Sequence, residues 1–190
     1  MQPSVRDTFI QFNEPLEGRV HFMYLDVKGL VSTGVGNLLD ADDPDHVGTN
    51  PSPLPEIFTL NWIDKNTHEA ADDATILGEY RTVKSSGTAH ATLAQKEAIT
   101  HLRTDDASID TLCMKKISDF ETKLRSRPPF ATLDDWPADG QLGLFSMAWA
   151  WASLTTSVIN CRFQLGSYTS DPAVPAGKPG RGRGTGAWPS

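Results

Sequence analysis

The sequence predicts a mixed α+β domain in which several helices accompany one β-hairpin. Three observations predict this class. The chain has 190 residues, of which 38% are hydrophobic and 22% charged, and such a composition suits a globular chain that buries a core without metal or disulfide staples. Residues 20–24 alternate between apolar and polar side chains, as in a strand with one buried face. Residues 105–126 carry an apolar stripe at helical spacing.

The N-terminal part predicts a short helix followed by the hairpin. Apolar residues recur on one helical face between Val5 and Phe12, and Pro15 is expected to limit how far this helix runs. Residues 20–24 and 30–35 then predict two strands. The Gly-containing turn at 26–29 joins them, so the two strands are expected to pair.

The middle of the chain predicts a loop and two helical stretches. Residues 40–55 are rich in Asp, Pro, Asn, Gly and Ser, which is typical of a loop. Apolar residues at 54–62 allow a helix there, and their spacing at 69–86 predicts a second helix. The region from 40 to 86 is also acidic, so an added substrate lip or a docking face is one interpretation of it.

Two helices are expected in the C-terminal half. Aspartates at the start of 105–126 and basic residues at its end complement the helix dipole, and Pro128 and Pro129 stop this helix. The uncharged segment 140–161 is long enough to raise the question of a membrane span. Its Ser, Thr and Asn residues favour a buried core helix instead, so no stable membrane span is predicted.

Charge and cysteine content exclude some classes of protein. The net charge is −7, which argues against a nucleic-acid partner because phosphate binding needs a basic face. Cys113 and Cys161 are too few for a disulfide framework, although a single bridge stays open. Cys113 lies on the apolar stripe and is expected in the core. Residues 1–165 are predicted to form one domain, followed by a flexible Gly/Pro/Arg tail at 166–190.

Two carboxylates near the hairpin are the first candidates for chemistry. Eight residues separate Glu17, where the first helix is expected to end, from Asp26 in the hairpin turn. Such a pair across a groove is what a glycosidase needs, with one carboxyl protonating the leaving oxygen. Spacing alone favours two solvated surface groups. The Gly34–Gly36 pair lacks the third glycine of a dinucleotide fingerprint, and the segment from His68 to Asp72 lacks the second histidine of a zinc-protease helix.

The segment from Glu17 to Leu39 closely resembles the signature of the phage-type lysozymes. It has the Glu-Gly start, the same Glu-to-Asp spacing, the Gly-containing turn, and a Gly-x-Gly strand before a Leu-Leu pair. The resemblance extends more weakly over residues 5–151. It implies a lysozyme-like α+β fold, with a hairpin lobe over about 1–100, a helical lobe over about 101–165 and a cleft between them.

The resemblance also implies roles for individual residues. Glu17 would be the general acid, and Asp26 the second carboxylate that positions or activates water. Ser32 stands where the family has a catalytic threonine, and Asn37 stands where most members have a histidine, so Asn37 is expected to bind substrate. The implied reaction is hydrolysis of the β-1,4 bond between N-acetylmuramic acid and N-acetylglucosamine in peptidoglycan, without metal or cofactor.

Two further expectations follow from where the resemblance stops. No match to the family's closing helices is found after about Ala152, so Trp149 is expected to be exposed. The first twelve residues contain no signal-peptide core. A protein made in the cytoplasm would then reach the cell wall through a holin, a secretion machine or a phage particle, and a delivery or inhibitor protein is an expected partner. The alternative is a non-catalytic module that binds peptidoglycan or a protein.

Overall fold

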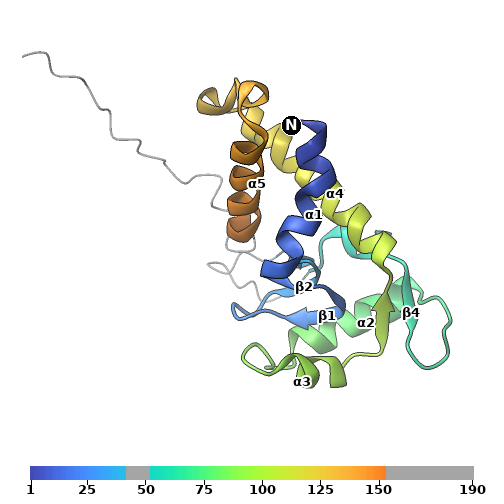
Figure 1. Cartoon of the computed structure of the whole chain (residues 1–190). Coiled ribbons are helices and arrows are strands. Elements are labelled where there is room, and N and C mark those ends of the chain that lie inside the picture. Colours follow the sequence, from blue (N-terminus) through green and yellow to red (C-terminus); the bar gives the residue numbers. More distant parts are fainter. Residues whose placement is uncertain (42–51, 153–190) are drawn as a thin grey trace, which may run out of the picture. The chain divides into compact units, whose positions relative to one another are not determined.

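A computed structural model describes residues 1–41 and 52–152 (Figure 1). It confirms a mixed α+β architecture. The helices are α1 (Pro3–Glu17), α2 (Asp73–Lys84), α3 (Leu93–Ala98), α4 (Asp106–Arg125) and α5 (Ala138–Ala152), with 3₁₀ turns η1 (Pro55–Thr59), η2 (Pro128–Phe130) and η3 (Leu133–Asp135). The strands are β1 (Val20–Leu25), β2 (Val31–Gly34), β3 (Asn37–Leu38), β4 (Trp62–Asp64) and β5 (Leu102–Thr104). The predicted tail at 166–190 lies outside the described residues.

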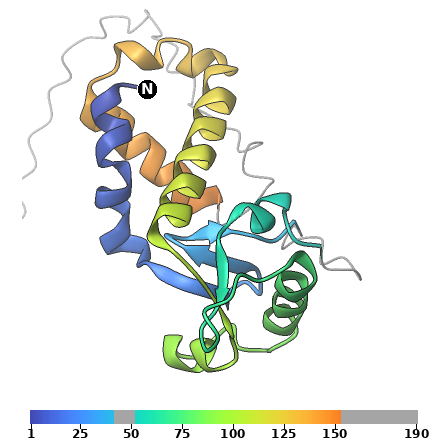
Figure 2. The ribbon, with the colours of Figure 1, turned by 90° about the vertical axis from the view of Figure 1, so that its right-hand side faces the viewer.

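Three helices pack together on one side of the hairpin, and α2 and α3 lie on its other side (Figure 2). Helix α1 contacts both α4 and α5. It begins with Pro3, where the missing N–H of proline costs nothing. It continues through Pro15 and ends at Glu17, where the sequence predicted its end. Buried Asn13 joins α1 to α5, because its Oδ1 accepts a hydrogen bond of 2.7 Å from Ser146 Oγ.

The predicted hairpin forms, and a third short strand extends it. β1 pairs antiparallel with β2, and β2 pairs antiparallel with β3. The second predicted strand, 30–35, is therefore shorter than expected, because the chain turns at Val35 and Gly36 to form β3. Gly34 and Gly36 both have positive φ values, 61° and 66°, and glycine adopts this conformation without the strain that a Cβ atom brings.

The region between the hairpin and α4 contributes to the core and differs in detail from the prediction. Helix α2 lies inside the predicted range 69–86, whereas 54–62 forms η1 and then enters β4. β4 pairs antiparallel with β5, a sheet that the sequence did not predict. Apolar residues of η1, β4 and α2 pack against the hairpin in one cluster that includes Ile57, Trp62 and Tyr80. These buried contacts give the described part of the region a structural role.

Helix α4 contributes to both hydrophobic clusters of the described chain. Leu112 belongs to the cluster of the hairpin and α2, whereas Ile109, Cys113 and Ile117 belong to the cluster of α1, α4 and α5. The predicted stripe is therefore confirmed as core. Asp105 caps this helix by accepting a hydrogen bond of 2.7 Å from the backbone N–H of Ser108.

Helix α5 covers the first part of the uncharged segment and buries one face in the core through Gln141, Phe145 and Trp149, so Trp149 is not exposed. Only 3% of Trp149 is accessible. Its indole meets Phe9 and Phe120 edge to face, with ring centroids 5.4 and 6.0 Å away, and Nε1 donates a hydrogen bond of 2.9 Å to Val35 O. α1, α4 and the hairpin therefore cover this side chain, which corrects the expectation. Within 1–41 and 52–152, no helix has the length and apolarity to cross a bilayer.

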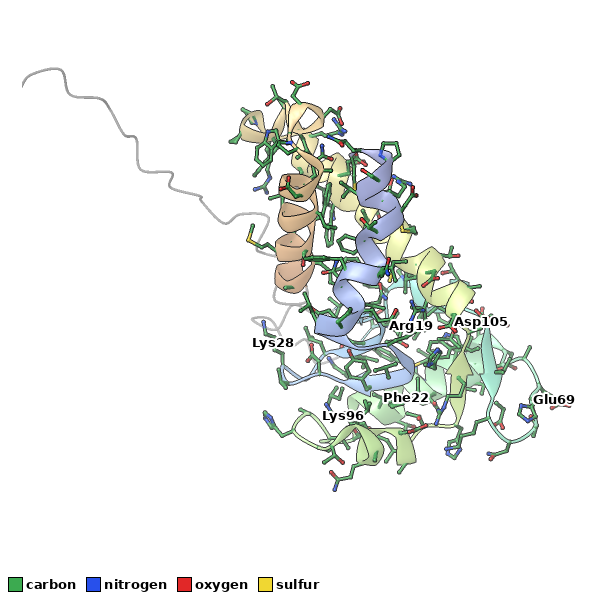
Figure 3. All side chains as sticks on the ribbon, in the orientation of Figure 1. Arg19, Phe22, Lys28, Glu69, Lys96 and Asp105 are labelled. Atoms are coloured by element: carbon green, nitrogen blue, oxygen red, sulfur yellow. The ribbon has the colours of Figure 1, made fainter. Side chains whose placement is uncertain are left out.

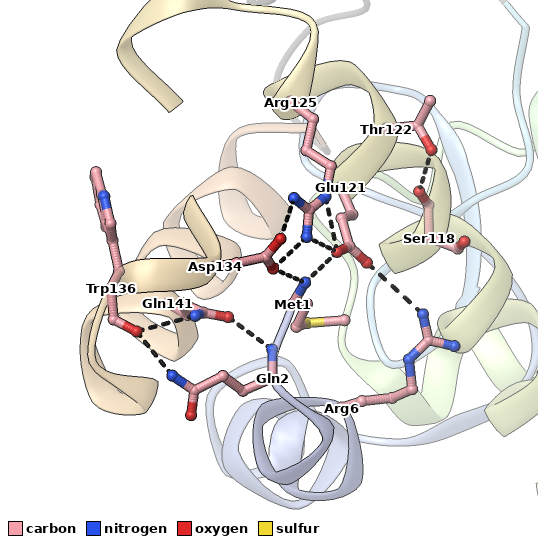
Figure 4. A network of polar contacts seen from close by, with 10 residues as sticks. All are labelled: Met1, Gln2, Arg6, Ser118, Glu121, Thr122, Arg125, Asp134, Trp136 and Gln141. Atoms are coloured by element: carbon pink, nitrogen blue, oxygen red, sulfur yellow. Dashed lines mark hydrogen bonds and ion pairs between the residues drawn. The ribbon is translucent and has the colours of Figure 1, made fainter. Parts of the chain in front are cut away.

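A polar network joins the start of α1 to the last turns of α4, to η3 and to the start of α5 (Figure 4). The Met1 ammonium contacts Glu121 and Asp134, and Arg125 bridges the same two carboxylates. Buried Gln141 accepts a hydrogen bond of 2.9 Å from the backbone N–H of Gln2. These contacts fix the N-terminal end of α1, whose other end carries Glu17.

Candidate active site around Glu17

Glu17 is the last residue of α1, as predicted, and its carboxylate is half-buried. Among the described residues it makes no hydrogen bond or ion pair. Burial therefore raises the pKa of Glu17 above its usual range. Its place in the last turn of the helix acts in the same direction, because the negative end of the helix dipole disfavours a carboxylate. A carboxyl group in this setting retains its proton more readily than an exposed glutamate.

Gly36 brings the turn after β2 against the Glu17 carboxylate. A Cβ atom placed on Gly36 would lie 3.0 Å from Glu17 Oε2 and 3.4 Å from Trp149 Nε1. Only a residue without a side chain allows this approach. Glu17 and Gly36, which are far apart within the segment 17–39, therefore lie in contact in the folded chain.

Arg19 anchors the segment that follows Glu17. Its guanidinium forms ion pairs with Glu14 at 3.0 Å, Asp106 at 3.0 Å and Asp110 at 2.9 Å. These contacts join the end of α1 to the first turns of α4. Three carboxylates around one guanidinium fix the backbone next to Glu17, and they leave Arg19 with its charge already neutralised.

Asp26 follows β1 directly and closes the hairpin turn. Its Oδ1 accepts hydrogen bonds from the backbone N–H groups of Lys28 at 2.8 Å and Leu30 at 2.9 Å. Both bonds end on Oδ1, so Oδ2 takes no part in them. The carboxylate is thus held in one orientation at the tip of the hairpin, which is the place that the sequence predicted for it.

Tyr24 lies within the electric field of both carboxylates. Burial raises the pKa of Tyr24 to about 12, and the negative charges of Asp26 and Glu17 act in the same direction. The phenol therefore stays protonated and can donate a hydrogen bond. Ser32 pairs with Tyr24 across the two strands, and cross-strand partners lie on the same face of the sheet. Ser32 itself is buried.

Asn37 is fully buried, with 0% of its surface accessible. Its Nδ2 donates a hydrogen bond of 3.1 Å to Cys113 Sγ, and its Oδ1 has no hydrogen-bond partner among the described residues. A side chain without accessible surface does not contact a substrate in this structure. This placement corrects the expectation of direct binding and leaves Asn37 supporting the turn that carries Gly36.

A cavity of about 240 Å³ opens beside Glu17. It is lined by Glu17, Gly18, Arg19, Val20, Tyr24, Leu93 and Lys96. Sequence reasoning did not single out Tyr24 or Lys96. The sequence alternation groups Tyr24 with the apolar residues Val20 and Phe22, whereas a register irregularity between Val20 and Tyr24 leaves Tyr24 only partly buried at the cavity. Lys96 comes from α3, and nothing in its local sequence shows that α3 packs against β1.

The described part of the chain holds no group of three or more His, Cys, Asp or Glu residues that could bind a metal ion. His68 lies in a turn with a positive φ of 61° instead of in a helix. Comparisons of the chain with known protein families, with curated proteins and with solved structures found no match. What the site does must therefore be inferred from its own residues.

Proposed function

We propose that this protein is a muramidase with a lysozyme-like arrangement of a hairpin lobe and a helical lobe. It would hydrolyse the β-1,4 bond between N-acetylmuramic acid and N-acetylglucosamine in peptidoglycan. The observation that carries the proposal is the Glu17 carboxyl group. It lacks a counter-charge among the described residues, its pKa is raised by burial, and it lines a cavity at the base of the hairpin.

Each carboxylate has a different part in the proposed reaction. Glu17 protonates the glycosidic oxygen as the bond breaks, and a pKa above the ordinary value keeps it protonated nearer to neutral pH. Asp26, held by the turn, is the second carboxyl group, which positions or activates water. The phenol of Tyr24 donates a hydrogen bond to the substrate or to that water. The proposed place of action is the bacterial cell wall.

The test is the release of reducing ends from purified peptidoglycan. Glu17→Gln removes the proton donor with almost no change in shape, and we expect a loss of about a hundredfold or more. Asp7→Asn is the matched control, because it makes the same chemical change on an exposed position of α1. The control should retain native activity.

The binding-module alternative gives a different result in the same assay. A folded native chain that releases no reducing ends, and that binds peptidoglycan equally well with and without Glu17→Gln, would replace hydrolysis by binding as the function. Equal activity of the native chain and Glu17→Gln would show that another group is the acid.

A further inference from the structure

Lys96 is a largely buried residue at the candidate site, and its ammonium group has no ion-pair partner among the described residues. It lies on α3 with 8% of its surface accessible, and its Nζ is 5.7 Å from the centroid of the Tyr24 ring. Figure 3 shows it beside β1, on the opposite side of the strand from the helical group. Within residues 1–41 and 52–152, its ammonium group makes no hydrogen bond or ion pair.

Three other buried or half-buried cations of the described chain are paired. Arg19 contacts three carboxylates, Lys84 contacts buried Asp40, and Lys116 donates a hydrogen bond to Leu38 O. Removing an ammonium from water costs free energy unless an anion or hydrogen-bond acceptors replace the water. A cation–π contact with Tyr24 recovers only part of that cost. Lys96 therefore lacks an interaction that comparable residues have.

Lys96 and Glu17 line the same cavity without forming an ion pair. Burial is the cause that raises the pKa of Glu17, and no effect of Lys96 opposes it. No ion pair joins the two groups, and both line the cavity. Arg19 also lines it, but its guanidinium is already occupied. The cavity consequently presents one proton donor and one unneutralised cation.

We propose that Lys96 binds a carboxylate of the glycan substrate and so makes the site specific for acidic, muramic-acid-containing strands. This inference rests on the proposed function. In peptidoglycan every second sugar carries a lactyl ether, whose carboxyl group is either free or linked to a stem peptide that has carboxylates of its own. Chitin, a polymer of N-acetylglucosamine alone, offers no such anion. A carboxylate on the ammonium would supply the missing hydrogen-bond acceptors.

The test compares charge on the protein with charge on the ligand. Binding is measured by calorimetry with the full chain carrying Glu17→Gln, so that no turnover occurs. The ligands are peptide-free glycan tetrasaccharides with free lactyl carboxylates, the same tetrasaccharides as methyl esters, and tetrasaccharides with intact stem peptides. The added protein variants are Lys96→Met, which keeps the apolar stem of the side chain, and Lys96→Arg, which keeps the charge.

Lys96→Met should weaken binding of a carboxylate ligand about tenfold or more, and Lys96→Arg should restore most of it. Esterification should weaken binding to the parent chain by a similar factor and have little further effect in Lys96→Met. A loss seen with the peptide-free ligand assigns the lactyl carboxylate, and a loss confined to the intact ligand assigns the stem peptide. If Lys96→Met does not fold, the parent chain must still discriminate against the ester.

Losses from Lys96→Met that are as large with the ester as with both carboxylate ligands, or no binding of any of the three ligands, would overturn the inference. The reducing-end assay separates this result from failure of the proposed function. Hydrolysis without any charge dependence removes only the role of Lys96. Charge-dependent binding without hydrolysis removes only the catalysis.

Discussion

The contact between Gly36 and Glu17 makes Gly36→Ala the most informative single substitution. The added methyl group would lie 3.0 Å from Glu17 Oε2 and 3.4 Å from Trp149 Nε1. The Trp149 indole is held by its hydrogen bond to Val35 O and by two aromatic rings, so it has little room to move. We therefore expect the Glu17 carboxylate to be displaced by several tenths of an ångström.

Two terms set the size of the effect on stability. Alanine at a φ of +66° costs about 1–2 kcal/mol because its Cβ is strained in the left-handed region. Crowding against Glu17 and Trp149 adds about 1–2 kcal/mol, as overpacking in a core does. The sum, roughly 2–4 kcal/mol, is larger than the strain alone. A displaced general acid should also reduce kcat/KM about 10- to 100-fold.

Gly87→Ala separates strain from crowding. Gly87 has a φ of +65°, and a Cβ atom placed there meets nothing within 4 Å. It lies beyond α2 and does not line the cavity. We expect this control to lose only the strain term, about 1–2 kcal/mol, and to retain native activity.

The assay is urea unfolding of both variants together with reducing-end release at a temperature where both are folded. Gly36→Ala should be the less stable of the two and the only one with reduced turnover. Equal destabilisation of the two variants, with native activity in both, would refute the reasoning that places the Gly36 backbone against the Glu17 carboxylate.

Three further predictions concern stability. The pKa of Glu17 is raised in the folded chain, so between the unfolded and folded pKa values the native state binds more protons than the unfolded chain, and stability falls as pH rises. Thermal melts of Glu17→Gln should lack this fall in stability. A parallel fall in the variant would contradict the raised pKa of Glu17. Burial lowers the pKa of Lys116 to about 8, so stability should rise between about pH 8 and the ordinary lysine pKa near 10.5, and Lys116→Met should flatten that rise in urea titrations. Asp40→Ala removes the buried acceptor of Tyr80 and Lys84 and should lower the free energy of unfolding by about 3–5 kcal/mol. Lys115→Ala breaks an exposed ion pair with Glu56 and should lower it by less than about 1 kcal/mol. Similar losses in urea unfolding would show that burial of the Asp40 pair is unimportant.

Local periodicity predicted the elements that carry their own signal. The apolar stripe of α4, with its acidic start and basic end, gave its bounds to within one residue, 106–125 against 105–126. The end of α1 at Glu17 and the turn at Asp26 were also predicted. Pairing of β4 with β5 was not predictable in this way, since each strand has three residues and Trp62 finds its partner at Thr104. Short strands with distant partners have no local pattern.

The candidate site was predicted only where its residues lie in one continuous segment. Glu17 and Asp26 became candidates through the resemblance of segment 17–39 to the phage-type lysozyme signature, and the negative charges of both contribute to the raised pKa of Tyr24. Lys96 was missed because its relation to Tyr24 depends on how α3 packs against β1. Asn37 was placed in the correct turn but given the wrong surroundings, since its burial depends on Cys113 from α4.

Helix α4 supplies side chains to both hydrophobic clusters, Leu112 to one and Ile109 with Ile117 to the other. If either cluster unfolded, α4 would lose part of the packing that stabilises it, and the other cluster would then lose its contacts with α4. The described chain should therefore unfold as one cooperative unit, with the hairpin and the helical group melting at the same temperature. Native-state hydrogen exchange should accordingly give the amides of α4 the highest protection, at the level of global unfolding.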